Sequence, residues 1–464
     1  MNNNRRNFLK KSLLGTLSLG IGSINDEAYS RILNQSDLSV TLGKGQSVMG
    51  LRCSALDTVR IAVIGLGRGG SAVSRLARIE GTQIVVIDDL VPERIANAQK
   101  TLIEAGRSEA IAYSQEDDWM KICERDDIDL IYNATPWDLH VPIAVYAMRH
   151  GKHVAIEVPA ALTIVDCWKL VDTAEETQRH CMMLENCCYD FFELTTLNME
   201  RQGLFGEVFY GECAYIHDLR MQLDRSDSYH NTWRVKYYTK HTGNPYPTHG
   251  LGPIAQLLKI NRGDRFDYLT SMSTDQRNLT LAAINKFGSD SIEAKAKYML
   301  GDMNVSLIRT ISGKTVMIQH DVTSPRPYDR IHKISGTKGY AVKYPEAKIA
   351  LDPDAHEFLD ADNFKSLSEK YAHPLSKYIG EKAKKIGGHG GMDYIMDWRL
   401  IYCLRHGLPL DQDVYDAATW SSIVELSEKS VLNRSQPIDV PDFTRGKWKS
   451  AQPWPIIDME NVFC

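Results

Sequence analysis

Glu157 is the residue whose position most invites a chemical interpretation. It directly follows the run His-Val-Ala-Ile at residues 153–156, which is patterned as a buried strand, and it precedes Val158 and Pro159. A carboxylate at such a point is either a loop residue that follows a strand or a group aimed into a site. In an open parallel sheet, ligands bind outside the carboxyl ends of the strands. The nature of the neighbouring strands therefore decides the role of Glu157.

A glycine-rich turn earlier in the chain predicts such a sheet. An apolar strand at residues 59–64 leads into Gly65, Gly67 and Gly70, and an amphipathic helix follows. In this G-x-G-x-x-G pattern the first glycine permits a sharp turn, the second lets a pyrophosphate approach the backbone, and the third lets helix and strand pack closely. The free N–H groups of the helix bind the phosphate. The pattern predicts a dinucleotide site, with a mononucleotide or flavin site as the alternative.

Two acids end the next predicted strand, "QIVVIDDL", about 20 residues after the turn, where dinucleotide-binding domains place an acid. We predict that Asp89, at the end of this run, accepts hydrogen bonds from the ribose diol, with Asp88 as the alternative. Because a carboxylate there repels a 2′-phosphate, the cofactor is predicted to be NAD rather than NADP.

The segment "DLIYNATPWDLHVPIAVYAMRHGKHVAIEVP" adds a strand, a helix and a further strand, which is one more repeat of a parallel sheet. The residues expected at the ligand-binding ends of these strands are Asn133, Thr135, Trp137, His140 and Glu157. Glu157 is thereby predicted to lie beside the nicotinamide half of the cofactor.

The pattern changes after about residue 160 to longer alternations such as "GEVFYGECAYI", which predict an antiparallel sheet with one covered face. The segment "MDYIMDWRLIYCLRHG" predicts a closing helix whose apolar stripe belongs to the core. The fold class is therefore α/β. We expect an N-terminal Rossmann dinucleotide-binding domain and a C-terminal α+β domain with a large, open, mostly antiparallel sheet.

Several stretches of the second domain are richer in tyrosine, histidine and arginine than a sheet face requires. Aromatic and polar groups on stiff loops suit a sugar, whose ring stacks and whose hydroxyls form hydrogen bonds. Taken singly, each tyrosine is as well explained as a half-buried structural residue. The residues concerned are Asn186, Tyr189, Tyr215, His217, Arg234, Tyr246, His249, Arg326 and Tyr328.

The composition is that of a globular protein, and 464 residues favour two domains. A formal charge of only -5 gives no reason to expect a nucleic-acid partner, which would need a basic face. The nine cysteines include no pair of C-x-x-C motifs, so we predict reduced core residues and neither a disulfide framework nor a metal site.

The N-terminal segment "NRRNFLKKSLLGTLSLGIGSI" resembles a twin-arginine export signal, with a hydrophobic region too short to span a bilayer. It predicts a periplasmic or cell-surface protein that meets the twin-arginine translocase and forms no stable membrane span. A disordered basic tail is the alternative. The predicted parts are a signal peptide at 1–30, a linker at 31–55, the NAD-binding Rossmann domain at 56–160 and the substrate-binding α+β domain at 161–464.

The segment from Thr135 to Thr163 resembles the second signature of the glucose-fructose oxidoreductase/inositol dehydrogenase (Gfo/Idh/MocA) superfamily, which reads T-P-N-x-x-H, then G-K-H-V, then E-K-P. Those enzymes oxidise sugar hydroxyls with a nicotinamide, and the lysine of E-K-P assists proton transfer. This chain has Val158 at that position. The resemblance therefore implies either a replacement for the lysine or a different reaction.

A narrower resemblance covers nearly everything after the linker. The motifs "ENCCY", "YIHDLR", "YPTHGLGP", "RPY", "GHGGMDY", "DVYDAATW" and "PDFTRGKW" look like those of glycoside hydrolase family 109, which contains NAD-dependent α-N-acetylgalactosaminidases. The resemblance implies oxidation at C3 of the sugar, elimination of the glycosidic oxygen after loss of the C2 proton, addition of water at C1, and reduction. The cofactor ends unchanged.

The resemblance also implies roles for individual residues. His249 is our first choice for the acid–base group, because imidazole titrates near neutral pH. Tyr246 and Tyr189 follow as hydrogen-bonding partners to O3 of the sugar or to the leaving oxygen. The expected cofactor-binding residues are Gly65, Gly67, Arg68, Gly70, Asp89, Trp137, Asp138, Leu139, His140, Glu157, Val158 and Asn186. The expected sugar-binding residues are Tyr215, Arg234, Tyr246, Pro247, Thr248, His249 and Tyr328.

Two other function classes compete with this hypothesis. A sugar dehydrogenase of the parent family would release NADH steadily from a free sugar, and Val158 argues against it. A non-catalytic sugar sensor would turn over no glycoside and would tolerate changes at His249. A hydrolase with two facing carboxylates finds no support, because no acid pair stands in a suitable context. The sequence leaves the oligomeric state open between a monomer and a homo-oligomer, although the broad second sheet often pairs in the parent family.

Overall fold

The computed structural model describes residues 45–223, 230–452 and 456. The predicted signal peptide at 1–30, and most of the predicted linker at 31–55, lie outside the described residues. Among the helices of the described part, none combines the length and the apolar character that a membrane crossing requires.

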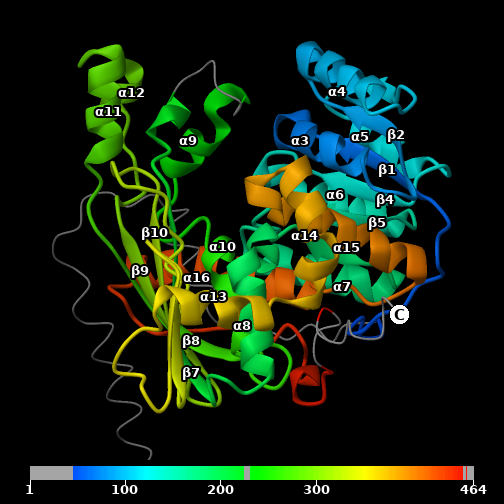
Figure 1. Ribbon diagram of the computed structural model, residues 1–464. Helices are drawn as coiled ribbons and strands as arrows, with labels where there is room; N and C mark the ends of the chain where they lie inside the picture. The colour runs from blue at the N-terminus through cyan, green and yellow to red at the C-terminus, as the bar shows by residue number, and fades with distance from the viewer. Residues whose placement is uncertain (1–44, 224–229, 453–455, 457–464) are drawn as a thin grey trace, which may run out of the picture. The chain divides into compact units, whose positions relative to one another are not determined.

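The first domain is built on a sheet of six strands in the order β3-β2-β1-β4-β5-β6 (Figure 1). All of its neighbouring strands are parallel, which confirms the predicted Rossmann sheet. Its strands are β1 (Val59–Ile64), β2 (Thr82–Asp88), β3 (Ile111–Tyr113), β4 (Leu130–Asn133), β5 (His153–Ile156) and β6 (Cys181–Met183). Its helices are α3 (Leu66–Leu76), α4 (Pro92–Glu104), α5 (Asp118–Glu124), α6 (Trp137–Arg149) and α7 (Ile164–Thr177).

The register of this sheet fixes where its ligand-binding edge lies. Ile64 at the end of β1 pairs with Asp88 of β2 and with Asn133 of β4, and Asn133 pairs with Ile156 of β5. Strands β4 and β5 are buried along their whole length, as expected for a parallel sheet covered on both faces. The residues that follow these strands, among them Glu157, therefore share one edge.

The first sheet extends beyond the boundary predicted at residue 160. Helix α7 and strand β6 follow that position, and β6 pairs with β5 in parallel. The apolar pattern of β6 is only three residues long, too short to be recognised as a strand by its periodicity. The sheet therefore ends at Met183 instead of near residue 160.

The second domain contains an eight-stranded sheet in the order β13-β12-β11-β7-β10-β9-β8-β14. Neighbouring strands are antiparallel except β7 and β10, which confirms a mostly antiparallel sheet. The strands are β7 (Val208–Ile216), β8 (Phe266–Ser273), β9 (Asn304–Thr310), β10 (Thr315–Asp321), β11 (Lys333–Gly336), β12 (Gly339–Val342), β13 (Lys348–Leu351) and β14 (Ile438–Asp439).

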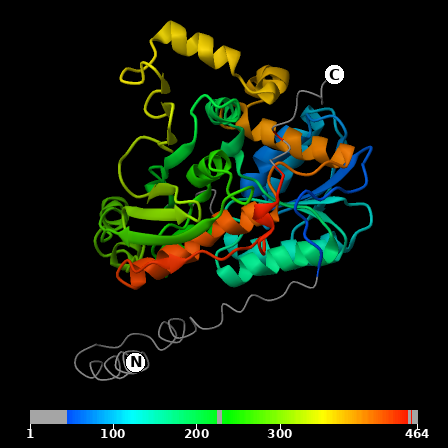
Figure 2. The ribbon, with the colours of Figure 1, turned by 90° about the horizontal axis from the view of Figure 1, so that it is seen from below.

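One face of this sheet is covered by helices. Helix α10 (Thr248–Leu257) packs on β7. Helix α16 (Val414–Leu432) packs on β8 and also contacts α7 of the first domain (Figure 2). Strand β9 alternates buried residues with more exposed ones, and its Leu307 is 53% exposed. A single covered face was predicted from this alternation.

The remaining helices surround the two sheets. The α-helices are α8 (Phe191–Arg201), α9 (Trp233–Tyr238), α11 (Asn278–Phe287), α12 (Ile292–Lys295), α13 (Ala361–Lys370), α14 (Pro374–Ile386) and α15 (Met392–His406). The short 3-10 helices are η1 (Asn186–Tyr189), η2 (Arg220–Leu223), η3 (His230–Thr232), η4 (His389–Gly391) and η5 (Lys447–Lys449).

Helix α15 ties the second half of the chain to the Rossmann sheet. Its predicted apolar stripe is buried, as expected for core. Arg75 of α3 donates from Nε to Oδ2 of Asp397 at 2.7 Å, and the hydroxyl of Tyr132 lies 3.1 Å from Oδ1 of the same acid. Among the described residues all eight cysteines are free and seven are buried, as predicted.

Candidate active site

The glycine turn has the geometry that a dinucleotide pyrophosphate requires. Gly65 has a φ of 87°, and a Cβ at this position would lie 2.6 Å from the carbonyl oxygen of Ala134, so only glycine fits. Gly67 and Arg68 are exposed at the start of α3, where the first N–H groups of a helix bind anions. The residues present therefore fit NAD at this turn.

The close contact between helix and strand is made by a different glycine from the one predicted. A Cβ on Gly69 would lie 2.9 Å from Cγ1 of Val63, whereas a Cβ on Gly70 would meet no atom within 4 Å. Gly69 is buried against β1, and Gly70 is partly exposed one residue further round the helix. The packing role predicted for Gly70 therefore belongs to Gly69.

Asp89 braces the glycine turn. Its Oδ2 accepts a hydrogen bond from the backbone N–H of Leu66 at 2.7 Å, and Nη1 of Arg94 lies 3.4 Å from the same oxygen. The neighbouring Asp88 is buried, and its Oδ1 makes no hydrogen bond to any described residue. Burial, followed by the charges of Asp118 and Asp89, raises the pKa of Asp88 to about 7. Both acids lie at the end of β2, and Asp89 as the ribose ligand stays a prediction.

The predicted cofactor segment from Trp137 to His140 is fastened to the loop after β5. The indole Nε1 of Trp137 donates to the carbonyl of Val158 at 3.2 Å. The two ring nitrogens of His140 lie 2.8 Å and 2.9 Å from the carbonyl oxygens of Pro159 and Thr135. The side chain of His140 is thus engaged and buried, so it positions this loop and does not itself face a ligand. Asp138 is exposed and Leu139 is partly buried.

Glu157, Arg68 and Asn186, which come from distant parts of the chain, are brought together by Asp393. Nε of Arg68 lies 3.3 Å from Oε1 of Glu157, and its Nη2 lies 3.3 Å from Oδ2 of Asp393. The amide of Asn186 donates to Oδ1 of Asp393 at 2.5 Å. Although burial opposes it, the hydrogen bond from His389 and the nearby arginines hold the pKa of Asp393 well below its usual range.

The predicted sugar-binding aromatic residues form one cluster. The centre of the Tyr215 ring lies 4.6 Å from the ring centre of Tyr246, 5.4 Å from that of His249 and 6.2 Å from that of Tyr328. The guanidinium of Arg234 lies 5.0 Å from the centre of the Tyr246 ring. These residues were predicted separately, and the structure brings them together.

Trp137 joins this aromatic cluster to the cofactor edge. Its ring lies 6.0 Å from that of Tyr246, and the guanidinium of Arg234 lies 4.7 Å from its centre. Trp137 begins helix α6, directly after the carboxyl end of β4. The predicted sugar-binding residues therefore adjoin the end of the Rossmann sheet where the cofactor is predicted.

His249 is held by a buried carboxylate. Its Nδ1 lies 2.8 Å from Oε1 of Glu185, and the side chains are 12% and 0% exposed. Pro247 and Thr248, which precede it at the start of α10, are buried, so they fix the backbone. Burial favours a higher pKa for Glu185, but the charge of His249 and its hydrogen bond lower it. Glu185 was not predicted from the sequence, although the residue adjoins Asn186 in "ENCCY".

A second imidazole with a buried carboxylate partner was also missed. Nδ1 of His389 lies 2.9 Å from Oδ2 of Asp393; the histidine side chain is 52% exposed and that of the acid only 1%. His389 adopts a φ of 45°, which is uncommon for a residue other than glycine and often marks a functional site. Burial, and then the positive charges of His249 and His389, lower the pKa of His217. The rings of His217 and His249 both lie near Tyr215, with their centres 5.7 Å and 5.4 Å from the centre of its ring.

Tyr189 does not join this cluster, contrary to the prediction that it is catalytic. It is 1% exposed, and its hydroxyl lies 3.3 Å from Oδ2 of Asp411. Asp411 is in turn paired with Arg399 at 2.6 Å. The hydroxyl that we expected to face a sugar therefore contacts a buried ion pair in the core.

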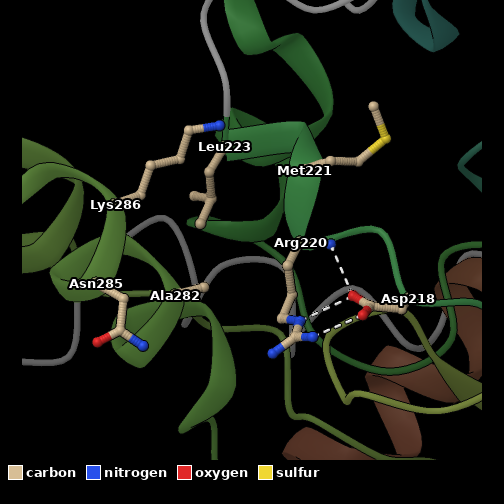
Figure 3. Close-up of a pocket in the computed structure, with 7 residues that line it drawn as sticks. All are labelled: Asp218, Arg220, Met221, Leu223, Ala282, Asn285 and Lys286. Carbon is tan, nitrogen blue, oxygen red and sulfur yellow. Dashed lines mark hydrogen bonds and ion pairs between the residues drawn. The ribbon is translucent and has the colours of Figure 1, made fainter.

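A pocket of about 370 Å³ lies between η2 and α11 (Figure 3). It contains none of the predicted site residues, although Asp218 on its wall follows His217. Arg220 pairs with Asp218 at 2.6 Å. The residues that line it are Asp218, Arg220, Met221, Leu223, Ala282, Asn285 and Lys286.

Comparison with known proteins finds a matching protein family for each half of the chain. The family model for the "glycosyl hydrolase 109, C-terminal domain" matches residues 189–450, and the model for the "oxidoreductase family, NAD-binding Rossmann fold" matches residues 59–185. An alpha-N-acetylgalactosaminidase of Bacteroides fragilis is 55% identical over 87% of this chain and 96% of its own length. Glycosyl hydrolase family 109 protein 2 of Phocaeicola vulgatus is 53% identical over 88% and 99%.

Solved structures share the fold at much lower identity. Levoglucosan dehydrogenase in complex with NADH and levoglucosan has a TM-score of 0.60 and 17% identity, covering 83% of this chain and all of that one. The apo scyllo-inositol dehydrogenase of Lactobacillus casei has a TM-score of 0.58 and 13% identity, covering 83% and 99%. The family matches and the relatives show that the chain is a glycoside hydrolase with an NAD-binding Rossmann domain, and it belongs to glycoside hydrolase family 109.

Proposed function

We propose that this enzyme releases terminal α-linked N-acetylgalactosamine and leaves its NAD unchanged at the end of each turnover. The observation that carries the proposal is the contact between the cofactor edge and the aromatic cluster, where the rings of Trp137 and Tyr246 lie 6.0 Å apart. A sugar bound on that cluster lies next to the place where a nicotinamide is expected. The relative from Bacteroides fragilis, whose name states this activity, supports the choice of sugar.

The glycine turn and the polar residues around Asp393 would hold the cofactor. Gly65, Gly67 and Arg68 fit its pyrophosphate, and Glu157 and Asn186 lie beyond the neighbouring strands β5 and β6. When bound, NAD would supply reversible hydride-transfer chemistry at C3 of the sugar. The buried Val158 offers no ammonium group for proton transfer, so other residues of this chain must move the protons.

His249 is suited to take the proton from C2 of the sugar. Glu185 accepts a hydrogen bond from Nδ1 of His249, which leaves Nε2 as the basic nitrogen. A C3 ketone acidifies the neighbouring C2–H, and the buried anion stabilises the imidazolium that forms. Loss of this proton allows the glycosidic oxygen to leave.

His389 is suited to serve the leaving oxygen and the attacking water. Its side chain is half exposed, whereas that of His249 is mostly buried. The aglycone departs toward solvent and water arrives from solvent, so the more exposed imidazole is the better placed for both. The carboxylate of Asp393 holds its Nδ1, as Glu185 does for His249.

An assay of a panel of nitrophenyl α- and β-glycosides, with the nucleotide bound to the purified protein identified, tests the proposal. We expect cleavage of the α-N-acetylgalactosaminide, bound NAD(H), and no accumulation of NADH. A steady release of NADH from the free sugar would instead show a dehydrogenase. Binding of the sugar without cleavage of any glycoside would show a sensor.

We also infer that the enzyme is exported by the twin-arginine route to the periplasm or cell surface. The paired Arg5 and Arg6, followed by a short apolar run, support this inference. Because that route carries folded proteins, NAD can be bound before export. Replacing both arginines with lysine should leave active enzyme in the cytoplasm, and unchanged fractionation would contradict the inference.

A further inference from the structure

Three side chains able to bind a metal ion meet beside the candidate acid–base group. The carboxylate of Glu185, the thiol of Cys187 and the imidazole of His249 each offer a ligand atom, and these atoms all lie within 4.8 Å of one another. Glu185 and Cys187 are fully buried, and the His249 side chain is 12% exposed. The reaction proposed above uses neither the thiol nor a metal.

The three donors match the preferences of Zn²⁺. Thiolate, imidazole and carboxylate are its usual ligands, at about 2.0–2.3 Å, so that tetrahedral ligand atoms lie about 3.3–3.6 Å apart. The observed separations therefore require side-chain shifts of about 1 Å. Three protein ligands leave the fourth position open to water, as in zinc sites that bind an exchangeable ligand.

A second observation points to a ligand at the same place. Oε2 of Glu185 accepts no hydrogen bond of good geometry within the described residues, although the side chain is 0% exposed and the nearby Thr248 hydroxyl helps to lower the pKa of Glu185. A buried carboxylate oxygen without a partner is costly, because the desolvation of its charge is not offset. A cation between Glu185, Cys187 and His249 would supply that partner.

We propose that Glu185, Cys187 and His249 form an inhibitory site for a thiophilic divalent cation such as Zn²⁺. The cation takes the place of the hydrogen on Nδ1 of His249, whose proton moves to Nε2, and the Cys187 thiol releases its proton to solvent as the metal–sulfur bond forms. No electron is transferred. The inhibition rests on the proposed function, whereas the binding itself does not.

Inhibition follows from the loss of the base. With the cation on Nδ1 of His249, the carboxylate of Glu185 neutralises the metal and no longer supports the imidazole. The proton displaced from Nδ1 occupies Nε2, so that nitrogen is no longer available as a base. Nε2 then cannot take the C2 proton, and activity falls although NAD and sugar still bind.

Titration of the purified enzyme with Co²⁺, a spectroscopic substitute for Zn²⁺, tests the binding without any substrate. We expect a thiolate-to-cobalt absorption band at one equivalent of metal, its loss on addition of Zn²⁺, and its absence in Cys187→Ala. Cys123→Ala is the matched control, since Cys123 is also fully buried but lies on α5. If Cys187→Ala fails to fold, Cys187→Ser keeps the size and removes the soft ligand.

Inhibition is measured separately with the α-N-acetylgalactosaminide. Zn²⁺ should inhibit the wild type and Cys123→Ala alike, EDTA should reverse this, and Cys187→Ala should need at least 10-fold more Zn²⁺. An absorption band that survives in Cys187→Ala, or its absence from the wild type, would overturn the metal site. If the wild type cleaves no glycoside, the proposed function fails while the cobalt titration still decides the inference.

Discussion

Nδ1 of His249 lies 2.8 Å from Oε1 of Glu185, a carboxylate whose side chain has no exposed surface. A buried anion at one ring nitrogen fixes the ring orientation and leaves the other nitrogen to act on the substrate. The same turn of the chain continues with Asn186, whose amide donates to Asp393, the partner of His389. Two successive residues thus support two imidazoles.

The substitution Glu185→Gln should lower kcat by about 10², the scale of losing general base catalysis. The amide keeps the size of the side chain but cannot stabilise an imidazolium. The acidic limb of the pH–rate profile should therefore also move to lower pH, which a purely structural role would not cause. Glu428→Gln is the matched control, because Glu428 contacts His241 at 3.0 Å and neither residue is part of the site. An unchanged profile in Glu185→Gln would contradict the role of Glu185.

Replacing His389 with alanine should lower activity to different extents on substrates with different leaving groups. If His389 protonates the departing oxygen, activity on a glycan, whose alcohol leaves poorly, should fall by about 10². Activity on the nitrophenyl glycoside should fall much less, because nitrophenolate leaves without help. The measurement is kcat/KM for both substrates, with thermal melts to verify folding. Equal losses on both substrates would argue that His389 acts elsewhere in the reaction.

Tyr189→Phe should leave kcat within about twofold of the wild type and lower the free energy of unfolding by about 1 kcal/mol. The hydroxyl contacts the buried Asp411 at 3.3 Å, and one lost hydrogen bond of this kind has about that effect. Urea unfolding and the glycosidase assay measure the two quantities. Tyr246→Phe gives the contrast, since Tyr246 lies in the aromatic cluster. A large loss of kcat in Tyr189→Phe would restore the catalytic role predicted from the sequence.

Asp88→Asn should stabilise the enzyme without nucleotide at pH 8 and have little effect at pH 4. The pKa of Asp88 is raised from 3.8 to about 7, so the folded state keeps a proton that the unfolded state loses. Stability therefore decreases as the pH rises from about 4 to about 7. The amide carries no charge at any pH and escapes this loss. Thermal melts across that range should converge toward pH 4, and parallel curves would contradict the burial of a charged Asp88.

The fold could be predicted because its signals are local. The strand at residues 59–64, the glycine turn and the alternating strands each show in a short window of sequence. Tyr246 and His249 were found for the same reason, since they share one proline-stiffened loop. Partners that lie far apart were missed. Glu185 meets His249 across 64 residues, and Asn186 meets Asp393 across 207.

Neighbouring positions with similar patterns were also confused. Gly69 and Gly70 differ only in which side of α3 they occupy, and the motif spacing alone favoured Gly70. Tyr189 follows Asn186 by three residues, yet its hydroxyl is taken by the core pair of Arg399 and Asp411. Both outcomes depend on tertiary packing that no short sequence window contains.

The most direct test of the account is the hydrogen at C2 of the released sugar. Cleavage of an α-N-acetylgalactosaminide in D₂O should place deuterium at C2, because the proton leaves during each turnover and returns from solvent. No NADH should accumulate, and thioglycosides should also be cut. The product is analysed by NMR and mass spectrometry. A product that fully retains its C2 hydrogen would contradict the elimination mechanism and leave a direct hydrolysis in its place.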